Sequence, residues 1–281
     1  MQKLLITGAS GFLGHRAAVY FSKKFRVETP SHAQLDITDP ICVQQFLQQS
    51  LPDIVLHCAA ISNVGQCEQE PERSWRINVQ GSVHIAQACR AVDAKCILCS
   101  SDQVYFGSPL SGSHSEEESL FPTNVYGKEK LAAEQKCLEE NPDSVLLRLS
   151  WMYDHQAFGS KEHRDFLRTL LEQLHINIPL CYPIYDRRGI TDVNEVLPNL
   201  EPAFQLPGGV YNFGSPNDCS TFDLMHQLFE QLGLTPTLCK NKQAFCTSPR
   251  NLCMDPAKAA SFGIHFSSTE AALLRNLKDF L

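Results

Sequence analysis

Two residues near the middle of the chain have the types and the spacing that proton transfer requires. Tyr126 and Lys130 lie four positions apart, so on a helix their side chains share one face, one turn apart. A lysine cation beside a phenol favours the phenolate and lowers the tyrosine pKa from its ordinary value of about 10. We therefore expect Tyr126 to exchange a proton with an alcohol or carbonyl group near neutral pH. The alternative is an ordinary surface pair of tyrosine and lysine.

A second group of polar residues follows an apolar segment at positions 95–99. Ser100, Ser101 and Asp102 come at the end of this segment, which has the composition of a buried strand. A hydroxyl at the carboxyl end of that strand could donate a hydrogen bond to the substrate oxygen that Tyr126 protonates. A helix cap or a turn is the alternative role for the two serines.

The third candidate is a glycine-rich turn at the start of the chain, which directly follows the apolar residues 3–6. Gly8, Gly11 and Gly14 have the spacing of a turn that brings backbone against a pyrophosphate. The first glycine permits the tight turn, the second lets the ligand approach, and the third lets a helix pack closely. The N-terminus of that helix would offer N–H groups and a positive dipole end to the anion. This turn predicts a nucleotide-binding site.

A parallel sheet would bring these three groups together, and the first half of the chain has the pattern of one. We expect strands at 4–6, 25–29, 53–58, 95–100 and 144–149, and helices at 12–23, 40–49, 73–92 and 124–140. Asp39 is the expected N-cap of the second helix. Short apolar strands that alternate with helices indicate a Rossmann-type, doubly wound α/β fold.

The second half is less regular and predicts a smaller α/β substrate domain. An amphipathic helix at 165–174, a strand at 209–213 and a helix at 221–232 that ends at Gly233 are expected there. We predict a dinucleotide-binding domain at 1–155 and a substrate-binding part at 156–281, with about 176–200 returning to the first domain. Ligands of doubly wound sheets bind at the carboxyl ends of the strands, so the second part should form the other wall.

Composition narrows the class of partner. The chain has 281 residues and a net charge of −7, which disfavours nucleic acid as a partner. No segment is long enough to span a membrane and no signal pattern opens the chain, so we expect a cytoplasmic protein. Most of its 12 cysteines sit inside apolar segments, and we expect these to act as small buried side chains. Cys96 and Cys99 have the spacing of a redox or zinc pair, but they flank a buried-strand pattern without a second pair, so no metal is expected.

Together these features resemble the extended short-chain dehydrogenase/reductase superfamily and, within it, the dTDP-4-dehydrorhamnose reductases. The likeness covers nearly the whole chain. It runs through LDITD at 35–39, PDIVLHCAA at 52–60, INV at 77–79, SSDQVY at 100–105, NVYGKEKLAAE at 124–134, SWMY at 150–153 and RNLCMD at 250–255.

The resemblance implies a role for each matching residue. Tyr126 is the proton donor, Lys130 holds the nicotinamide ribose, and Ser101 polarises the carbonyl. The implied cofactor contacts are Gly8, Ser10, Gly11, Phe12, Leu13, Gly14, Ser31, His32, Asp36, Ile37, Cys58, Ala59, Ala60, Asn78, Ser100 and Lys130. The implied substrate contacts are Ser101, Asp102, Tyr126, Trp151 and Arg250, the last suited to a phosphate or base oxygen.

The choice of nicotinamide cofactor depends on the segment after the second strand. An NAD enzyme needs an acidic side chain there, and Glu28 falls within the expected strand instead. With Asp36 as the anchor, Ser31 takes the position of the acid and His32 that of a common arginine. Both can bond a 2′-phosphate, so we expect NADPH, with NADH as the alternative. A solvated loop histidine is the other interpretation of His32.

Departures from the family pattern fall on the substrate side. Gln103 stands where the family has an aromatic residue, Asp165 where it tends to have asparagine, and Asp192 and Glu195 where a Thr-Tyr pair is common. The reaction type is therefore better indicated than the sugar.

Three functions follow. The first is reduction of a 4-keto group on a nucleotide-linked deoxysugar, a step of dTDP-rhamnose biosynthesis. The second is a sugar-nucleotide epimerase or dehydratase that holds NAD tightly. The third is a non-catalytic regulatory subunit similar to the beta subunit of methionine adenosyltransferase, against which the joint presence of Ser101, Tyr126 and Lys130 argues. The helix at 73–92, with Trp75, could supply a homodimer face, although a buried core helix has the same pattern.

Overall fold

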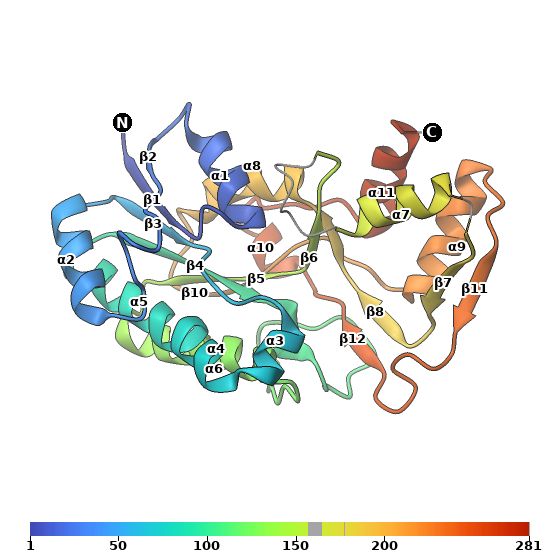
Figure 1. Cartoon of the computed structure of the whole chain (residues 1–281), viewed down its shortest axis with the longest axis horizontal. Coiled ribbons are helices and arrows are strands. Elements are labelled where there is room, and N and C mark those ends of the chain that lie inside the picture. Colours follow the sequence, from blue (N-terminus) through green and yellow to red (C-terminus); the bar gives the residue numbers. More distant parts are fainter. Residues whose placement is uncertain (157–164, 177, 281) are drawn as a thin grey trace.

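A parallel sheet forms the largest layer of the computed structural model, which describes residues 1–156, 165–176 and 178–280 (Figure 1). Its strand order is β10-β5-β4-β3-β1-β2, and every neighbouring pair is parallel. The strands are β1 (Lys3–Thr7), β2 (Arg26–Glu28), β3 (Ile54–His57), β4 (Lys95–Ser101), β5 (Val145–Leu149) and β10 (Gly209–Phe213). The predicted Rossmann-type α/β class is confirmed.

Helices cover both faces of this sheet, and alternate strand residues pack against them. Leu4 and Ile6 share a buried cluster with α1 (Phe12–Phe21) and α8 (Val193–Ala203). Leu5 faces the opposite way, into a cluster with α2 (Pro40–Ser50), α5 (Ser82–Ala91) and α6 (Val125–Glu140). This alternation follows from the two-residue period of a strand, and it explains why the strand segments are almost continuously apolar.

The predicted helix ends are set by local capping. Asp39 accepts hydrogen bonds from the backbone N–H groups of Ile41 and Cys42 at the start of α2, as expected. Asn124 caps α6 by accepting from Gly127. The expected long helix at 73–92 is correct in position but consists of α4 (Pro71–Trp75), a π-helical turn (Arg76–Gly81) and α5, preceded by the short helix α3 (Val64–Gln69). A 3₁₀ turn (Asp102–Tyr105) directly follows β4.

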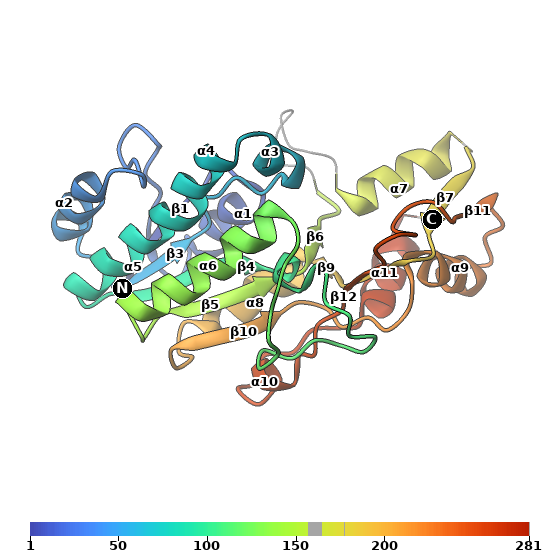
Figure 2. The ribbon, with the colours of Figure 1, turned by 90° about the horizontal axis from the view of Figure 1, so that it is seen from below.

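The second half forms a smaller unit of short strands and helices. Its strands pair as β6 (Trp151–Tyr153) with β9 (Ile190–Asp192), β7 (Leu180–Pro183) with β11 (Leu238–Asn241), and β8 (Asp186–Arg188) with β12 (Arg250–Leu252). Its helices are α7 (Phe166–His175), α9 (Thr221–Leu232), α10 (Ala257–Ala260) and α11 (Thr269–Lys278). The helix α9 ends at Gly233 with φ +66°, as predicted. Figure 2 shows α7, α9 and α11 at the end of the molecule opposite α2.

One strand of the second half belongs to the large sheet, and one helix of the second half packs on it. The helix α8 packs on the face that carries α1, and β10 pairs with β5 along five residues from Gly209 to Phe213. We therefore propose that the dinucleotide-binding domain comprises 1–155 together with 193–213, a return that overlaps the predicted segment 176–200. Within the described ranges, no helix has both the length and the apolar character that crossing a bilayer requires.

Candidate active site

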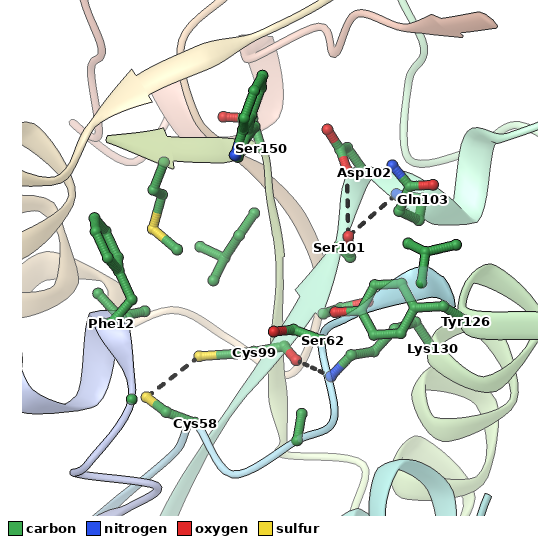
Figure 3. Close-up of a pocket in the computed structure, with 18 of the residues that line it drawn as sticks. Phe12, Cys58, Ser62, Cys99, Ser101, Asp102, Gln103, Tyr126, Lys130 and Ser150 are labelled. Atoms are coloured by element: carbon green, nitrogen blue, oxygen red, sulfur yellow. Dashed lines mark hydrogen bonds between the residues drawn. The ribbon is translucent and has the colours of Figure 1, made fainter. Parts of the chain in front are cut away.

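A pocket of about 490 Å³ opens at the carboxyl ends of the sheet strands, between the two halves of the chain (Figure 3). Residues from both halves line it: Gly8, Gly11, Phe12, Leu13, Gly14, Cys58, Ala60, Ser62, Val64, Cys99, Ser100, Ser101, Asp102, Gln103, Tyr126, Lys130, Leu149, Ser150, Trp151, Met152, Asp165, Arg188 and Arg250. The glycine turn, the serines at the end of β4 and the Tyr126–Lys130 pair thus share one cavity, as the sequence predicts.

The glycine turn presents bare backbone to this pocket. Gly8 has φ +67°, and a Cβ atom there would lie 2.6 Å from the backbone nitrogen of Ala59. A Cβ on Gly14 would lie 2.4 Å from the carbonyl oxygen of Gly8, so α1 packs directly on the turn. Gly11 is the N-cap of α1 and no side chain caps that end. The first N–H groups of α1 therefore suit a bound anion such as a pyrophosphate.

The proposed catalytic side chains come from β4 and α6 and point into the same space (Figure 3). Tyr126 and Lys130 are buried, and the Lys130 Nζ lies 5.7 Å from the centre of the Tyr126 ring. Lys130 Nζ donates to the Cys99 carbonyl at 2.8 Å. The Ser101 hydroxyl donates to Asp102 Oδ1 at 3.2 Å and accepts from the Gln103 N–H at 3.2 Å. A substrate oxygen between Ser101 and Tyr126 would meet two hydroxyl groups.

The expected effect of Lys130 on Tyr126 is wrong. The pKa of Tyr126 is raised above its ordinary value, because burial of the phenol outweighs its hydrogen bond with Ser101 and the nearby Asp102 carboxylate raises the pKa further. Burial also lowers the pKa of the Lys130 ammonium, although neighbouring Cys99 and Glu134 oppose this. Tyr126 therefore retains its proton at neutral pH, which suits a proton donor rather than a base.

A buried polar network beneath the pocket fixes α6 against the sheet. The Ser100 hydroxyl donates to Glu134 Oε1 at 2.5 Å, and Arg148 donates to Glu134 Oε2 at 2.7 Å. Arg148 also donates to the Tyr105 hydroxyl at 2.7 Å, which in turn donates to Asn212 Oδ1 at 2.7 Å. These bonds join α6 to β4, β5 and β10. They thereby hold the helix that carries Tyr126 and Lys130 in register with the strand that carries Ser101.

Asn78 lies outside the pocket lining and supports it from behind. Its side chain accepts from the Ile61 N–H at 2.8 Å and donates to the Ile61 carbonyl at 3.0 Å. It also donates to the buried carboxylate of Glu129 at 2.8 Å. The π-helical turn aims this side chain at the loop that carries Ala60 and Ser62 into the pocket.

At the end of the pocket near Trp151, the structure adds a residue that was not predicted. Arg188 contacts Asp102 at 3.2 Å and its guanidinium lies 4.8 Å from the centre of the Trp151 ring. Its buried Nε has no hydrogen-bond partner in the described part of the chain. Arg250, which was predicted, forms two bonds to Asp186 at 2.7 and 2.9 Å. The pocket thus has two guanidinium groups and an indole that is 40% exposed.

Burial at this end also changes protonation. The pKa of Asp102 is raised by burial, although the charges of Arg188 and Arg250 oppose the shift. The pKa of Arg188 is lowered by burial, and Asp102 opposes that shift in turn. The charge of Asp102 therefore favours the charged form of Arg188, and the charge of Arg188 favours the charged form of Asp102.

Seven predicted cofactor contacts do not line this pocket: Ser10, Ser31, His32, Asp36, Ile37, Ala59 and Asn78. Ser31 and His32 are exposed on the loop after β2, where Ser31 donates to Gln34. Asp36 accepts from Thr38, and its neighbour Ile37 is buried. The carboxylate of Glu28, the alternative acidic residue, contacts Lys3 at 3.0 Å. The loop after β2 thus presents Ser31 and His32 to solvent, while Glu28 is already paired.

Several lining residues were not predicted as contacts: Ser62, Val64, Cys99, Gln103, Leu149, Ser150, Met152, Asp165 and Arg188. The two-residue period of β4 puts Cys99 on the same side as Ser101, so strand periodicity could have identified it. Two adjacent arginines at 187–188 were the available signal for Arg188. Among the described residues, no cluster of three or more histidine, cysteine or acidic side chains could hold a metal ion.

Comparison with known proteins gives a family match over almost the entire chain. The model for the RmlD substrate binding domain matches residues 1–280. A dTDP-4-dehydrorhamnose reductase from Streptomyces griseus is 36% identical over 83% of this chain and 77% of its own length. Another from Mycolicibacterium smegmatis is 37% identical over 60% of this chain, and the chain spans only 50% of that relative.

Two further matches concern the fold of the chain and the alternative function of a regulatory subunit. The crystal structure of a Bacillus anthracis dTDP-4-dehydrorhamnose reductase in complex with NADP superposes with a TM-score of 0.86, at 24% identity over 99% of both chains. The beta subunit of methionine adenosyltransferase 2 from Rattus norvegicus is 31% identical over 54% of this chain and 47% of its own length.

Proposed function

The chain belongs to the RmlD substrate-binding-domain family, and on this basis we propose that it reduces the 4-keto group of a nucleotide-linked deoxysugar with NADPH. It is an NAD(P)-dependent oxidoreductase of the short-chain dehydrogenase/reductase type. The observation that carries the proposal is the convergence of Ser101, Tyr126 and Lys130 beside the glycine turn in one pocket. The dTDP-4-dehydrorhamnose reductases among its relatives suggest a thymidine diphosphate sugar as the substrate.

The dinucleotide fits the bare backbone at the start of α1. Gly8 and Gly11 leave room for a pyrophosphate, and the uncapped N–H groups of α1 would bond it. When bound, NADPH supplies a hydride. The Lys130 ammonium, which is held by the Cys99 carbonyl, would bond the nicotinamide ribose.

The proton in this reaction comes from the protein. Tyr126 holds a proton on its hydroxyl at neutral pH because burial raises its pKa. Ser101 lies close enough to lower that pKa through a hydrogen bond, so both hydroxyls can contact one substrate oxygen. Tyr126 donates its proton to that oxygen as the carbonyl becomes an alcohol.

The nucleotide end of the substrate would meet Trp151, Arg188 and Arg250. An exposed indole can stack on a base, and guanidinium groups suit diphosphate oxygens. Ser31 and His32 support NADPH over NADH, because both are exposed after β2 and the competing carboxylate of Glu28 is paired with Lys3.

The test is NADPH consumption by the purified protein with dTDP-4-dehydrorhamnose. We expect turnover, and a loss of about 10²- to 10⁴-fold in kcat for Tyr126→Phe, the usual contribution of a general acid. Tyr20→Phe, at a half-buried position of α1 away from the pocket, is the matched control and should retain full turnover. Normal turnover by Tyr126→Phe would remove this residue from its proposed role.

The methionine adenosyltransferase match supports one second candidate, a non-catalytic regulatory subunit. That function predicts NADPH binding and a stoichiometric partner without turnover of any sugar nucleotide. An epimerase or dehydratase would instead be purified with bound NAD and recycle it. A cytoplasmic location and a homodimer formed through the half-exposed Trp75 belong to the proposal as well, and light scattering tests the dimer.

A further inference from the structure

Two cysteine side chains face each other on the floor of the pocket. The Sγ atoms of Cys58 and Cys99 lie 3.6 Å apart, and both residues line the cavity (Figure 3). Cys58 follows the last residue of β3, and Cys99 belongs to the adjacent strand β4. Because His57 pairs with Leu98, the two cysteines are the next residues along neighbouring parallel strands.

This placement suits a disulfide bond. Neighbouring strands lie about 4.8 Å apart, which is inside the range of about 4.4 to 6.8 Å that disulfides allow between Cα atoms. The sulfur atoms would have to approach from 3.6 Å to a bond length of about 2.05 Å. Side-chain rotation and a small movement of the two strand ends would be enough.

The two thiols differ in acidity. The pKa of Cys99 is lowered, first by its hydrogen bond with Cys58 and then by the positive charge of Lys130, while burial opposes the shift. The pKa of Cys58 is raised by the same hydrogen bond and by burial. One member of the pair is therefore the better nucleophile, and the other is available to resolve a mixed disulfide.

Two other pairs of neighbouring cysteines lie outside the pocket lining. Cys89 and Cys96 interact within the core, where both are at most 1% exposed. Cys181 and Cys239 are register partners in β7 and β11, outside the pocket. Cys58 and Cys99 combine proximity with access from the cavity.

We propose that Cys58 and Cys99 form an oxidisable dithiol site that closes to a disulfide when it reacts with a low-molecular-weight disulfide. The Cys99 thiolate attacks one sulfur of the reagent, and the other sulfur leaves as a thiolate that takes up a proton. Cys58 then loses its proton and attacks Cys99 Sγ in the mixed disulfide, which releases the second reagent thiol. Two protein thiols and one reagent disulfide become one protein disulfide and two reagent thiols.

Formation of this disulfide would directly alter the proposed dinucleotide site. The backbone of Cys58 packs against the glycine turn, since a Cβ on Gly8 would lie only 2.7 Å from the Cys58 carbonyl carbon. Movement of Cys58 toward Cys99 therefore changes the backbone that would hold the pyrophosphate. A bound dinucleotide would in turn cover the two sulfur atoms. This linkage to NADPH rests on the proposed function, whereas the disulfide itself does not.

The experiment uses the full chain with Cys181→Ser and Cys239→Ser, which removes the pair outside the pocket. The protein is treated with oxidised glutathione and digested, and a peptide that links Cys58 to Cys99 is sought by mass spectrometry. NADPH affinity is measured by fluorescence before treatment, after treatment and after reduction. We expect the linked peptide, an affinity at least about tenfold weaker, recovery on reduction, and slower oxidation in the presence of NADPH.

Cys99→Ser on the same background is the matched variant. Whatever its own affinity, it should form no linked peptide and bind NADPH equally before and after treatment. Absence of the linked peptide in the parent protein overturns the dithiol site, and an unchanged affinity of the linked protein overturns its coupling to the cofactor. Failure of the reduced protein to bind NADPH contradicts the proposed function instead, and the linked peptide still reports on the dithiol.

Discussion

At the scale of single residues, burial decides the protonation of the proposed catalytic groups. The short Tyr126–Lys130 spacing suggests a phenolate, but the phenol lies in a protein environment that penalises the charged form. A neutral tyrosine and a proton to donate are the consequence. This protonation state fits the proposed reduction of a carbonyl, the direction in which the enzyme must supply a proton.

This protonation state predicts the pH profile of the reaction. A proton donor must hold its proton, so activity falls only when the pH exceeds its pKa. Since burial raises the pKa of Tyr126, kcat/KM for carbonyl reduction should show no alkaline decline that depends on this residue below pH about 10. The profile is measured by NADPH consumption in buffers of constant ionic strength. A decline centred near neutral pH would mean that Lys130 outweighs burial after all.

His57 shows the same effect of burial on a histidine. Its Nδ1 lies 2.7 Å from the Thr7 hydroxyl and its Nε2 lies 3.2 Å from the Ser82 hydroxyl. Ser82 donates to the Asn78 carbonyl, so its oxygen can accept a hydrogen bond from Nε2–H of His57. Burial together with the charge of Lys130 lowers the pKa of His57 to about 3, so the imidazole is neutral at neutral pH and Thr7 can donate to Nδ1.

This pKa predicts a pH-dependent stability. In the unfolded chain His57 has an ordinary pKa of about 6.5, so it binds a proton below that pH, whereas in the folded chain it stays neutral. The free energy of unfolding therefore falls as the pH drops below 6.5. Between pH 6.5 and 4.5 this loss amounts to about 2 kcal/mol. In urea titrations, His57→Gln should lose about 2 kcal/mol less unfolding free energy than the parent protein between pH 6.5 and 4.5. Parallel profiles of the two proteins would show that His57 has the same pKa in the folded and the unfolded chain.

At the scale of elements, the geometry of the site depends on the contacts that hold the N-terminus of α1 and the loop after β3 against the sheet. The glycine turn packs against the strand end at Ala59, and Asn78 holds the next loop through both polar groups of Ile61. The hydrogen bonds from Asn78 replace those that the Ile61 backbone would otherwise make to water. Loss of one partner leaves a buried polar group unsatisfied, which costs about 1 to 3 kcal/mol.

The Asn78 tie gives a direct test. Asn78→Ala removes the partner of the Ile61 N–H and carbonyl and of the Glu129 carboxylate, so we expect unfolding free energy to fall by about 2 to 4 kcal/mol. Asn78→Asp retains an acceptor for the Ile61 N–H but places a second negative charge beside Glu129. We expect this variant to be no more stable than Asn78→Ala. Urea unfolding measures both. Wild-type stability in Asn78→Ala would mean that the loop is held by other contacts.

The two glycines at the start of α1 should separate folding from binding. In Gly14→Ala the new methyl group lies 2.4 Å from the Gly8 carbonyl oxygen, so α1 must move and the protein should be less stable. In Gly11→Ala the nearest atom is 3.2 Å away, so the fold should largely persist while the methyl group occupies the space of the pyrophosphate. Thermal unfolding with and without NADPH distinguishes them: Gly11→Ala should lose the stabilisation by NADPH. Full stabilisation there would move the pyrophosphate elsewhere.

At the scale of the whole molecule, the second half of the chain completes both the sheet and the pocket. Strand β10 covers the edge of β5, and α8 covers a face whose apolar residues include Val145 and Leu147. Trp151, Arg188 and Arg250 then close the cavity from the other side. Folding of the first half of the chain and formation of the far wall of the pocket are therefore coupled.

This coupling predicts the behaviour of a fragment. A chain of residues 1–155 lacks β10 and α8, so it exposes an unpaired strand edge and an apolar face. We expect it to aggregate or to unfold without a cooperative transition, whereas the full chain unfolds cooperatively in urea. Circular dichroism and light scattering make the comparison. A soluble fragment that binds NADPH would show that 1–155 is an autonomous domain.

Much of this architecture follows from the sequence because its causes are local. Helix caps at Asp39 and Asn124, the positive φ at Gly8 and Gly233, and the apolar strand segments depend on neighbouring residues along the chain. The four-residue spacing of Tyr126 and Lys130 likewise survives into α6. Short-range sterics and hydrogen bonds determine these features, and they are readable without a structure.

Other features were decided only by tertiary structure, because they depend on residues that are distant in sequence. The raised pKa of Tyr126 comes from burial of its phenol by several elements, whereas the spacing to Lys130 predicts a lowered pKa. Arg188 reaches Asp102 across 86 positions, and Cys58 meets Cys99 across 41. Local patterns specify which segments form strands and helices, but desolvation and long-range pairing arise only when those segments pack.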